Sequence, residues 1–430
     1  MGGEEGIVRW PDTVEDLVPF ESLSKFERIG LGGFGCVYKA KMEGYKRPVA
    51  VKVLAVNRPN VTAMFVQEAA VLRMVEHENI VQYIGVVNIP QGARHIAEAI
   101  DGPKLAFIEE YLEGGTVQNL LMKQMISPFR KVYSLELALD FLLGIASALR
   151  YLHKLRPLVL HRDLTPDNIL VTKKNGRLVA KLIDFGLTML IDENGEPVNR
   201  LSTMFLSSDS RAKKAPFEFA VPPSSTDDDI ASPEPEIKAT ETDHNSQAAW
   251  PQGENYDIAA GENENQNHEN EDDHAAVMRR SSERLIELPD KRKSMSLKNL
   301  IRKYNLTGQT GSYMYMAPEV YSCSPYNESA DVFSFGVIMY EIFSRNLLVV
   351  SETDMESPIE SKLYADKVSK GFRPKMPENL PIEVKELVQQ CTAGNPCDRP
   401  SFSEIVSHLH DLEESEILNK AGEVSCCRCM

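Results

Sequence analysis

Two short motifs that lie close together constrain this chain of 430 residues more than any other feature. Residues 161–170 read His-Arg-Asp-Leu-Thr-Pro-Asp-Asn-Ile-Leu, and Leu-Ile-Asp-Phe-Gly follows at 182–186. Asp163 and Asn168 fall on a predicted loop before an apolar run, and Asp184 closes the second motif. One carboxylate at this spacing suits a proton acceptor, while the second carboxylate and the amide suit ligands for a divalent cation.

A glycine-rich segment near the N-terminus supplies a second predicted part. Gly30, Gly32 and Gly35 have the spacing Gly-x-Gly-x-x-Gly. Without side chains at these points, backbone N–H groups can approach phosphate closely. A lone motif of this kind could also be a dinucleotide fingerprint, but β-favouring residues follow it where a dinucleotide site would open a helix. The predicted phosphate-binding loop comprises Gly30, Leu31, Gly32, Gly33 and Gly35.

A lysine and a glutamate form the third predicted part. The strand pattern at 49–52 ends on Lys52, and residues 62–76 show the pattern of an amphipathic helix. Glu68 lies within the apolar stripe of that helix. A surface position is the commoner fate of a lysine. However, a glutamate among apolar neighbours needs a partner, and Lys52 is the available cation.

Taken in order along the chain, these motifs resemble those of the protein kinase family. Later segments add to the resemblance: Gly-Ser-Tyr-Met-Tyr-Met-Ala-Pro-Glu at 311–319, Asp-Val-Phe-Ser-Phe-Gly at 331–336 and Cys-Asp-Arg-Pro at 397–400. The resemblance covers residues 25–190 and 306–412. It implies an α+β, bilobal protein kinase fold with a small β-rich N-lobe and a larger helical C-lobe.

The resemblance also implies a role for each predicted site residue. Asp163 would be the catalytic base, Lys52 would bind phosphates of ATP and pair with Glu68, and Asn168 and Asp184 would bind Mg²⁺. Backbone groups near residues 110–112 would bind the edge of the adenine. The nucleotide site would then consist of Gly30, Leu31, Gly32, Gly33, Gly35, Val37, Ala50, Lys52, Glu110, Leu112 and Leu170.

Further positions carry structural expectations from the same resemblance. Glu109 falls at the gatekeeper position beside the nucleotide, where an acid is unusual for the family, and a slip of one residue would put Ile108 there instead. Glu319 and Arg399 would pair as buried charges. A regulatory spine would stack Leu72, Tyr83, His161 and Phe185.

Two further residues restrict the choice of kinase group and of the amino acid that accepts the phosphate. Thr165 stands where serine/threonine kinases typically have lysine, which resembles the tyrosine-kinase-like group with its Raf-like and LIM-kinase-like members. Ser312 falls where serine/threonine kinases keep a hydroxyl facing the catalytic aspartate. We therefore expect phosphoryl transfer from ATP to Ser/Thr hydroxyls of proteins in intracellular signalling. Dual specificity, tyrosine specificity, a pseudokinase scaffold and a small-molecule kinase remain alternatives.

The charge of the chain is concentrated in one predicted insert. The net charge is −16, and residues 226–273 alone hold 15 Asp and Glu against one lysine. Residues 274–305 reverse the sign. Because this stretch is rich in polar residues and poor in large apolar ones, we expect a disordered insert within the activation segment. The basic part has no interleaved aromatic residues, so no nucleic-acid binding is expected.

Two regulatory expectations concern the insert and the C-terminus. Arg162 would bind a phosphorylated residue of the activation segment, with Thr307 and Thr310 as candidate sites for an upstream kinase. Cys427 occupies the place of a C-a-a-X box, which would attach the protein peripherally to the cytoplasmic face of a membrane. The residues after Cys427 depart from the preferred aliphatic pair, and a flexible tail with incidental cysteines is the alternative.

The composition and the motif positions predict a cellular compartment and a set of domain boundaries. No run of 18 apolar residues exists, and seven cysteines without framework spacing indicate a reducing, cytoplasmic setting. We expect an N-terminal tail at 1–24, an N-lobe at 25–109, the first part of a C-lobe at 110–190, the insert at 191–305, the second part of the C-lobe at 306–412 and a tail at 413–430.

Overall fold

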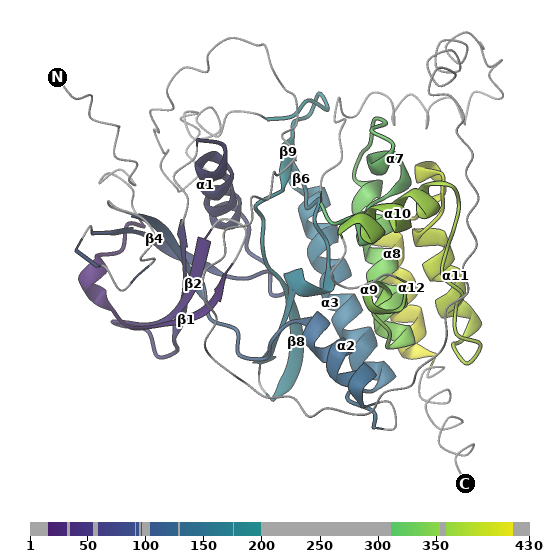
Figure 1. Ribbon diagram of the computed structural model, residues 1–430, viewed down its shortest axis with the longest axis horizontal. Coiled ribbons are helices and arrows are strands. Elements are labelled where there is room, and N and C mark those ends of the chain that lie inside the picture. Colours follow the sequence, from purple (N-terminus) through teal and green to yellow (C-terminus); the bar gives the residue numbers. More distant parts are fainter. Residues whose placement is uncertain are drawn as a thin grey trace, which may run out of the picture. The chain divides into compact units, whose positions relative to one another are not determined.

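The β-branched runs of the N-terminal part form a five-stranded antiparallel sheet (Figure 1). Its strands are β1 (Leu23–Leu31), β2 (Gly35–Met42), β3 (Val49–Leu54), β4 (Tyr83–Ile89) and β5 (Lys104–Glu110), in the order β1-β2-β3-β5-β4. A short 3-10 helix, η1 (Phe20–Ser22), precedes them.

A computed structural model describes residues 16–31, 35–54, 59–90, 92–93, 96, 104–127, 130–174, 176–198, 311–352 and 358–415. All of these belong to one compact unit. Most of the predicted insert lies outside the described residues, as do Gly32, Gly33, Thr307, Thr310 and Cys427.

Helix α1 (Pro59–Met74) packs on one face of the sheet. Its Phe65 lies against Phe107 of β5, with ring centroids 5.0 Å apart. The helix begins and ends slightly earlier than the predicted range 62–76. Pro59 can occupy the first turn because its missing N–H would have no partner within the helix there. The opposite face of the sheet carries a separate apolar cluster that includes Val51, Val53 and Ile108.

The C-terminal part is mainly helical. Its longer helices are α2 (Val117–Ile126), α3 (Leu135–Lys154), α8 (Ser329–Ser344), α10 (Pro358–Ser369), α11 (Ile382–Cys391) and α12 (Phe402–Glu414). Ser134 caps α3, since its side chain accepts a hydrogen bond from the N–H of Leu137. The shorter elements are α7 (Pro318–Tyr321), α9 (Leu348–Ser351), η3 (Tyr313–Tyr315) and η4 (Pro396–Asp398).

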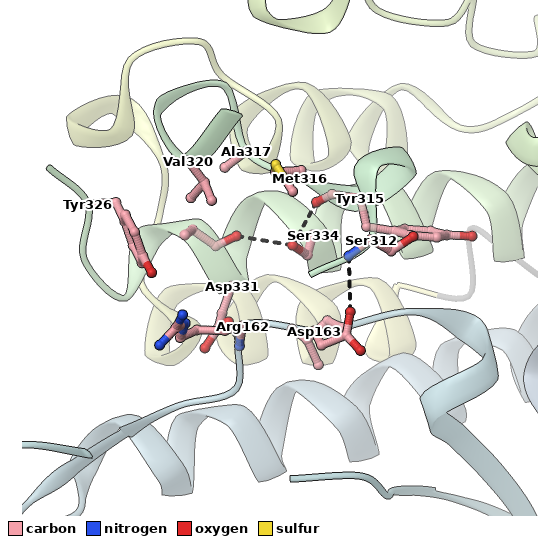
Figure 2. A pocket seen from close by; sticks show the side chains of 12 residues that line it. Arg162, Asp163, Ser312, Tyr315, Met316, Ala317, Val320, Tyr326, Asp331 and Ser334 are labelled. Atoms are coloured by element: carbon pink, nitrogen blue, oxygen red, sulfur yellow. Dashed lines mark hydrogen bonds between the residues drawn. The ribbon is translucent and has the colours of Figure 1, made fainter. Parts of the chain in front are cut away.

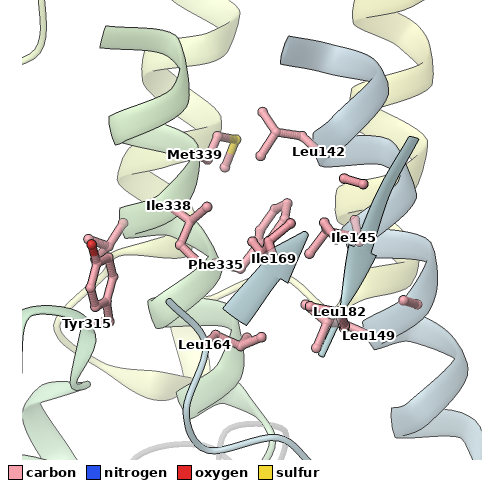
Figure 3. Packing of buried hydrophobic residues seen from close by; sticks show 14 of the residues in the cluster. Leu142, Ile145, Leu149, Leu164, Ile169, Leu182, Tyr315, Phe335, Ile338 and Met339 are labelled. Atoms are coloured by element: carbon pink, nitrogen blue, oxygen red, sulfur yellow. The ribbon is translucent and has the colours of Figure 1, made fainter. Parts of the chain in front are cut away.

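Helix α8 forms the centre of this helical part. Almost all of its residues are buried, including the acids Asp331 and Glu341. Figure 3 shows Phe335 and Met339 of α8 pointing toward α3, where Leu142 and neighbouring apolar residues complete the packing. This apolar core explains the leucine-rich pattern of α3 without any cofactor.

Two small antiparallel sheets position the loops that carry the paired motifs. β6 (Leu158–Leu160) pairs with β9 (Met189–Ile191), and β7 (Ile169–Lys174) pairs with β8 (Arg177–Leu182). The loop at 161–168, which ends in η2 (Pro166–Asn168), runs from β6 to β7, and Asp184 follows β8. The strand-rich N-terminal part and the helical C-terminal part agree with the predicted fold class. No helix in the described part of the chain is long and apolar enough to cross a membrane.

Candidate active site

The predicted pairing of Lys52 with Glu68 is confirmed. Lys52 Nζ lies 2.7 Å from each carboxylate oxygen of Glu68, and both side chains are buried. Asp184 Oδ1 lies 4.0 Å from the same nitrogen. Burial alone would lower the pKa of Lys52, but Glu68, Asp184 and Glu109 together raise it above its usual value. Lys52 is therefore a positive charge facing more than one acid.

Asp163 is held by two hydrogen-bond donors from distant parts of the chain. Asn168 Nδ2 donates to Asp163 Oδ2 at 3.1 Å and to its backbone oxygen at 2.8 Å. The backbone N–H of Ser312 donates to Asp163 Oδ1 at 3.1 Å (Figure 2). Burial raises the pKa of Asp163. A carboxylate that is fixed in orientation and has a raised pKa suits a proton acceptor.

The expectation for Ser312 needs a correction. Its hydroxyl was expected to face Asp163, but the hydrogen bond comes from its backbone N–H. The preceding Gly311 adopts a positive φ of 94°, and a Cβ there would lie 2.4 Å from the backbone oxygen of Arg162. The close approach of the two backbones therefore depends on Gly311, and it brings the amide of Ser312 within reach of Asp163.

Asp331 holds the backbone of the same loop, a role that was not predicted for it. Its carboxylate accepts the backbone N–H groups of His161 and Arg162, each at 2.9 Å, and lies 2.9 Å from His153 Nε2. Burial opposes its ionisation, but these partners hold the pKa of Asp331 below its usual range. Arg162 has a positive φ of 69°, an uncommon conformation for this residue type. The two bonds from Asp331 stabilise that backbone beside Asp163.

Asp184 and Asn168 are the predicted Mg²⁺ ligands. Asp184 Oδ1 accepts the N–H of Gly186 at 3.1 Å, and the Asp184 side chain is 35% exposed. The Nδ2 of Asn168 donates to Asp163, which leaves the amide oxygen of Asn168 for the predicted ligand role. Within the described residues, no cluster of three His, Cys, Asp or Glu side chains forms a closed metal site. One carboxylate and one amide oxygen fit Mg²⁺, which usually keeps waters and substrate phosphates as its other ligands.

The predicted spine is found in part. The His161 and Phe185 rings lie 5.2 Å apart between centroids. Leu72 belongs to the same buried apolar cluster as Phe185, and Tyr83 is half-buried against that cluster. Phe185 also donates its backbone N–H to Glu68 at 3.4 Å, which connects the Asp-Phe-Gly segment to α1.

The register of the sheet places the predicted nucleotide-binding side chains together. Val37 of β2 lies opposite Lys52 of β3, and Ala50 is two residues before Lys52. Residues that oppose one another in an antiparallel sheet, and residues two apart in a strand, share one face. Val37, Ala50 and Lys52 therefore lie on the same face of the sheet. Gly30 and Gly35 lie at the adjoining ends of β1 and β2, with Leu31 as the last residue of β1.

The C-terminal end of β5, at Glu110, is held by contacts that were not predicted from the sequence. Glu110 donates its backbone N–H to the Gln82 carbonyl at 2.9 Å, and its carboxylate accepts the Gln82 N–H at 2.9 Å and an ion pair from buried Lys181. The backbone N–H of Glu110 is therefore not available to a nucleotide. Leu112, two residues after Glu110, is buried. Leu170, the remaining predicted adenine contact, is the second residue of β7.

The alternative between Glu109 and Ile108 at the gatekeeper position is also resolved. Glu109 lies opposite Ala50 in the sheet and shares its face. Ile108 is fully buried in the apolar cluster on the other face. The acid, not the isoleucine, therefore shares the sheet face of Ala50 and Lys52.

The predicted pair of Glu319 and Arg399 is confirmed as a two-point contact. Arg399 Nη1 and Nη2 lie 2.6 and 2.8 Å from the two carboxylate oxygens of Glu319. Arg399 also donates to the backbone oxygens of Ala393 and Ser329, each at 2.9 Å. This pair fastens the segment that follows Ser312 to the helical core.

A small pocket lies between the Asp163 loop and this segment (Figure 2). Tyr315 forms part of its wall and is tied from both ends. Ser334 donates to the backbone oxygen of Tyr315 at 2.8 Å, and the Tyr315 hydroxyl donates to the buried Glu341 carboxyl at 2.9 Å. The remaining wall is mostly apolar, with Met316, Ala317, Val320 and Tyr326 beside Arg162 and Asp163.

Two family models match the chain on either side of the predicted insert. The protein kinase domain model matches residues 23–212, and the model named protein tyrosine and serine/threonine kinase matches residues 291–409. Together they cover well over half of the sequence.

Curated relatives match nearly the whole chain at low identity. RGS domain-containing serine/threonine-protein kinase A of Dictyostelium discoideum is 22% identical over 426 residues, which make up 98% of this chain and 25% of the relative. Serine/threonine-protein kinase CTR1 of Arabidopsis thaliana is 26% identical, covering 93% of this chain and 33% of the relative. Dual specificity protein kinase shkA of D. discoideum is 25% identical, covering 94% and 50%. The chain thus spans half or less of the length of these three relatives.

Proposed function

The chain belongs to the protein kinase family, within its tyrosine-kinase-like group, and from this premise we propose that it transfers the γ-phosphate of ATP to serine and threonine hydroxyls of protein substrates. The observation that carries the proposal is the joint presence of the Lys52–Glu68 pair and the Asp163–Asn168 contact. A pseudokinase scaffold would not need both.

The residues would divide the reaction between them. Lys52, positioned by Glu68, binds phosphate oxygens of ATP. Asp163 accepts the proton of the substrate hydroxyl, and its two oxygens are already oriented by Ser312 and Asn168. A Mg²⁺ ion held by Asn168 and Asp184 supplies positive charge against the phosphates. Most of the rate enhancement would come from positioning and electrostatic stabilisation rather than covalent chemistry.

A protein substrate is supported by the segment that follows Ser312. The pocket beside Asp163 has an apolar wall, and Glu319 and Arg399 fix that wall to the helical core. An extended substrate chain could thus be held next to Asp163. Thr165 replaces the lysine that serine/threonine kinases typically place near the transferred phosphate, so one cation is missing there. We expect a slower phosphoryl transfer as a consequence.

The test is an assay with γ-labelled ATP and a generic protein such as myelin basic protein, followed by phosphoamino-acid analysis. Phosphoserine and phosphothreonine that disappear in the Asp163→Asn variant support the proposal. Phosphotyrosine as the main product would refute the serine/threonine specificity. A wild-type protein that transfers no label to the substrate protein, or transfers no more than Asp163→Asn does, would refute the kinase activity itself.

We further propose that an upstream kinase, or the protein itself, phosphorylates the activation segment. Arg162 lines the pocket beside Asp163 and could pair with such a phosphate through charge-assisted hydrogen bonds. Thr307 and Thr310, a few residues before Ser312, are the candidate sites. The double variant Thr307→Ala with Thr310→Ala should lower activity. A transfer rate that neither this variant nor phosphatase treatment changes would contradict the proposal.

A further inference from the structure

Glu109 is an acid on the same sheet face as Ala50 and Lys52, and it has no role in the proposed phosphoryl transfer. It lies opposite Ala50 of β3 and opposite Tyr83 of β4. Its side chain therefore projects from the sheet face that carries Ala50 and Lys52. The next residue, Glu110, is where the chain leaves the sheet. Glu109 thus lies between the segment expected to bind the adenine edge and the lysine expected to bind phosphate.

The charges around Glu109 determine its chemical state. The groups that act on it are Lys52, Glu68, Asp184 and Glu110, of which three are acids. Lys52 is already engaged at 2.7 Å by both oxygens of Glu68. Burial raises the pKa of Glu109 to about 8, Lys52 opposes the shift and the three acids add to it.

A neutral carboxyl group follows from this environment at neutral pH. Such a group offers one acceptor, its carbonyl oxygen, and one donor, its O–H. Among the described residues, none forms a hydrogen bond with the Glu109 carboxyl group. Its donor and its acceptor are both available to a ligand.

The orientation of bound ATP follows from the proposed function, on which this inference rests. The phosphates lie toward Lys52 and Asp184, and backbone groups at 110–112 take the N1 edge of adenine. The purine edge that carries the 6-amino group and N7 is then left to face the cleft wall between these two ends. Glu109 lies between these two ends, on the sheet face that carries Ala50 and Lys52.

The chemistry of that edge matches a neutral carboxyl group. Adenine presents a donor and an acceptor there, and Asn or Gln side chains bind the same two atoms with two parallel hydrogen bonds. Guanine presents two acceptors at the same edge. A single O–H can satisfy only one of them, and the carbonyl oxygen of the acid would face the other.

We propose that Glu109 reads the base of the nucleotide: its carbonyl oxygen accepts from the 6-amino group, its O–H donates to N7, and the cleft thereby selects adenine over guanine nucleotides. Glu109 would be a specificity-determining residue that touches the substrate without taking part in phosphoryl transfer. A site built around two such hydrogen bonds discriminates strongly against a ligand that cannot form them.

The test combines two variants with three nucleotides on the full chain. Affinities for MgATP, MgGTP and the magnesium complex of 7-deaza-ATP, which lacks the N7 acceptor, are measured by calorimetry. The wild type should bind 7-deaza-ATP roughly tenfold more weakly than ATP, the value of one hydrogen bond. Glu109→Gln keeps a donor and an acceptor and should keep this preference. Glu109→Met should bind ATP and 7-deaza-ATP equally and lose part of its preference for ATP over GTP.

A pH series and a control variant add two independent checks on the role of Glu109. Raising the pH above 8 should weaken ATP binding to the wild type but not to Glu109→Gln, because only the glutamate loses its proton. Glu78→Gln, which removes an exposed acid outside the cleft, should behave like the wild type. Equal wild-type affinity for ATP and 7-deaza-ATP would overturn the role of Glu109 alone. A wild type that binds no nucleotide would overturn both this role and the proposed function.

Discussion

Two buried ion pairs, one in each part of the fold, differ in what surrounds them. Arg399 meets Glu319 through two hydrogen bonds and gives its other donors to backbone oxygens of Ala393 and Ser329. Every contact of this pair is made within the protein. Lys52 meets Glu68 just as closely, but the Asp184 carboxylate also lies 4.0 Å from its Nζ. The lysine faces more negative charge than it can neutralise.

The difference indicates what each pair is for. A buried charge whose partners are complete contributes to the fold, and removing one partner leaves the other uncompensated. A cluster that holds more carboxylates than cations is stabilised when it binds a further cation such as Mg²⁺. In the proposed function, Lys52 of this cluster also binds a phosphate of ATP. We therefore interpret the pair near α12 as structural and the pair near α1 as part of a ligand site.

Breaking the closed pair should have the largest effect on stability. Glu319→Gln leaves Arg399 buried without its charge partner and should lower the free energy of unfolding by about 3–5 kcal/mol. Urea unfolding followed by circular dichroism measures this. The exposed neighbour provides a matched control, since Asp398→Asn should change stability by less than about 0.5 kcal/mol. Equal stability of Glu319→Gln and the control would show that the pair has no structural role.

Removing acids from the open site should instead abolish activity and spare the fold. Asp163→Asn and Asp184→Asn should each reduce phosphoryl transfer by on the order of 10²-fold or more, the cost of one lost electrostatic contact in a catalytic site. Their melting temperatures should match or exceed that of the wild type, because each substitution relieves crowding of negative charge. Transfer within threefold of wild type in both variants would contradict the assignment of the site.

The sequence predicted the parts of the fold that depend on local pattern. The strand that carries Lys52, the helix that carries Glu68 and the spacing of Asp163, Asn168 and Asp184 are all local signals. The structure contains these elements, although β3 continues past Lys52 to Leu54. The Glu319–Arg399 pair was reached through family motifs. In these cases a few neighbouring residues carry the information.

Contacts that depend on the register of distant segments could not be predicted. Lys181 meets Glu110 only because β8 passes beside the end of β5. Tyr315 meets Glu341 because the segment after the insert packs on α8. The sequence did indicate that Glu341 needs a hydrogen-bond donor, because it is an acid inside the apolar run of α8. It did not indicate which residue would be that donor.

Glu341 adds a third case to the two ion pairs because its carboxyl is buried with hydrogen-bond donors in place of a cation. Tyr315 donates its hydroxyl and Leu348 its N–H, yet burial raises the pKa of Glu341 to about 8. The folded state therefore binds this proton more tightly than the unfolded state, and stability falls as the pH rises from about 4.5 toward 8.

Glu341→Gln should remove that dependence, since an amide does not ionise. Its loss of stability between pH 5 and 8 should be smaller than that of the wild type by on the order of 2 kcal/mol. Thermal unfolding across this pH range measures the difference, and Glu109 contributes equally to both proteins. Parallel curves for the two proteins would mean that Glu341 ionises normally in the fold.

Removing the hydroxyl of Tyr315 should have the smallest effect. Tyr315→Phe leaves one hydrogen bond of Glu341 unmade, which costs about 1 kcal/mol, and it loosens the wall of the pocket beside Asp163. We expect KM for a protein substrate to rise severalfold while KM for ATP stays unchanged. Equal changes in both constants would indicate a general loss of structure instead.

The contrast between the two ion pairs is best tested with Lys52→Met and Arg399→Met in the same two assays. We predict that Lys52→Met loses phosphoryl transfer by on the order of 10²-fold or more. It should lower the unfolding free energy by less than Arg399→Met does, because burial already raises the pKa of Glu68, which can take up a proton once the lysine is removed. Arg399→Met should lower the unfolding free energy by about 3 kcal/mol or more. A Lys52→Met protein that unfolds while Arg399→Met stays as stable as the wild type would contradict the assignment of a ligand site to one pair and a structural role to the other.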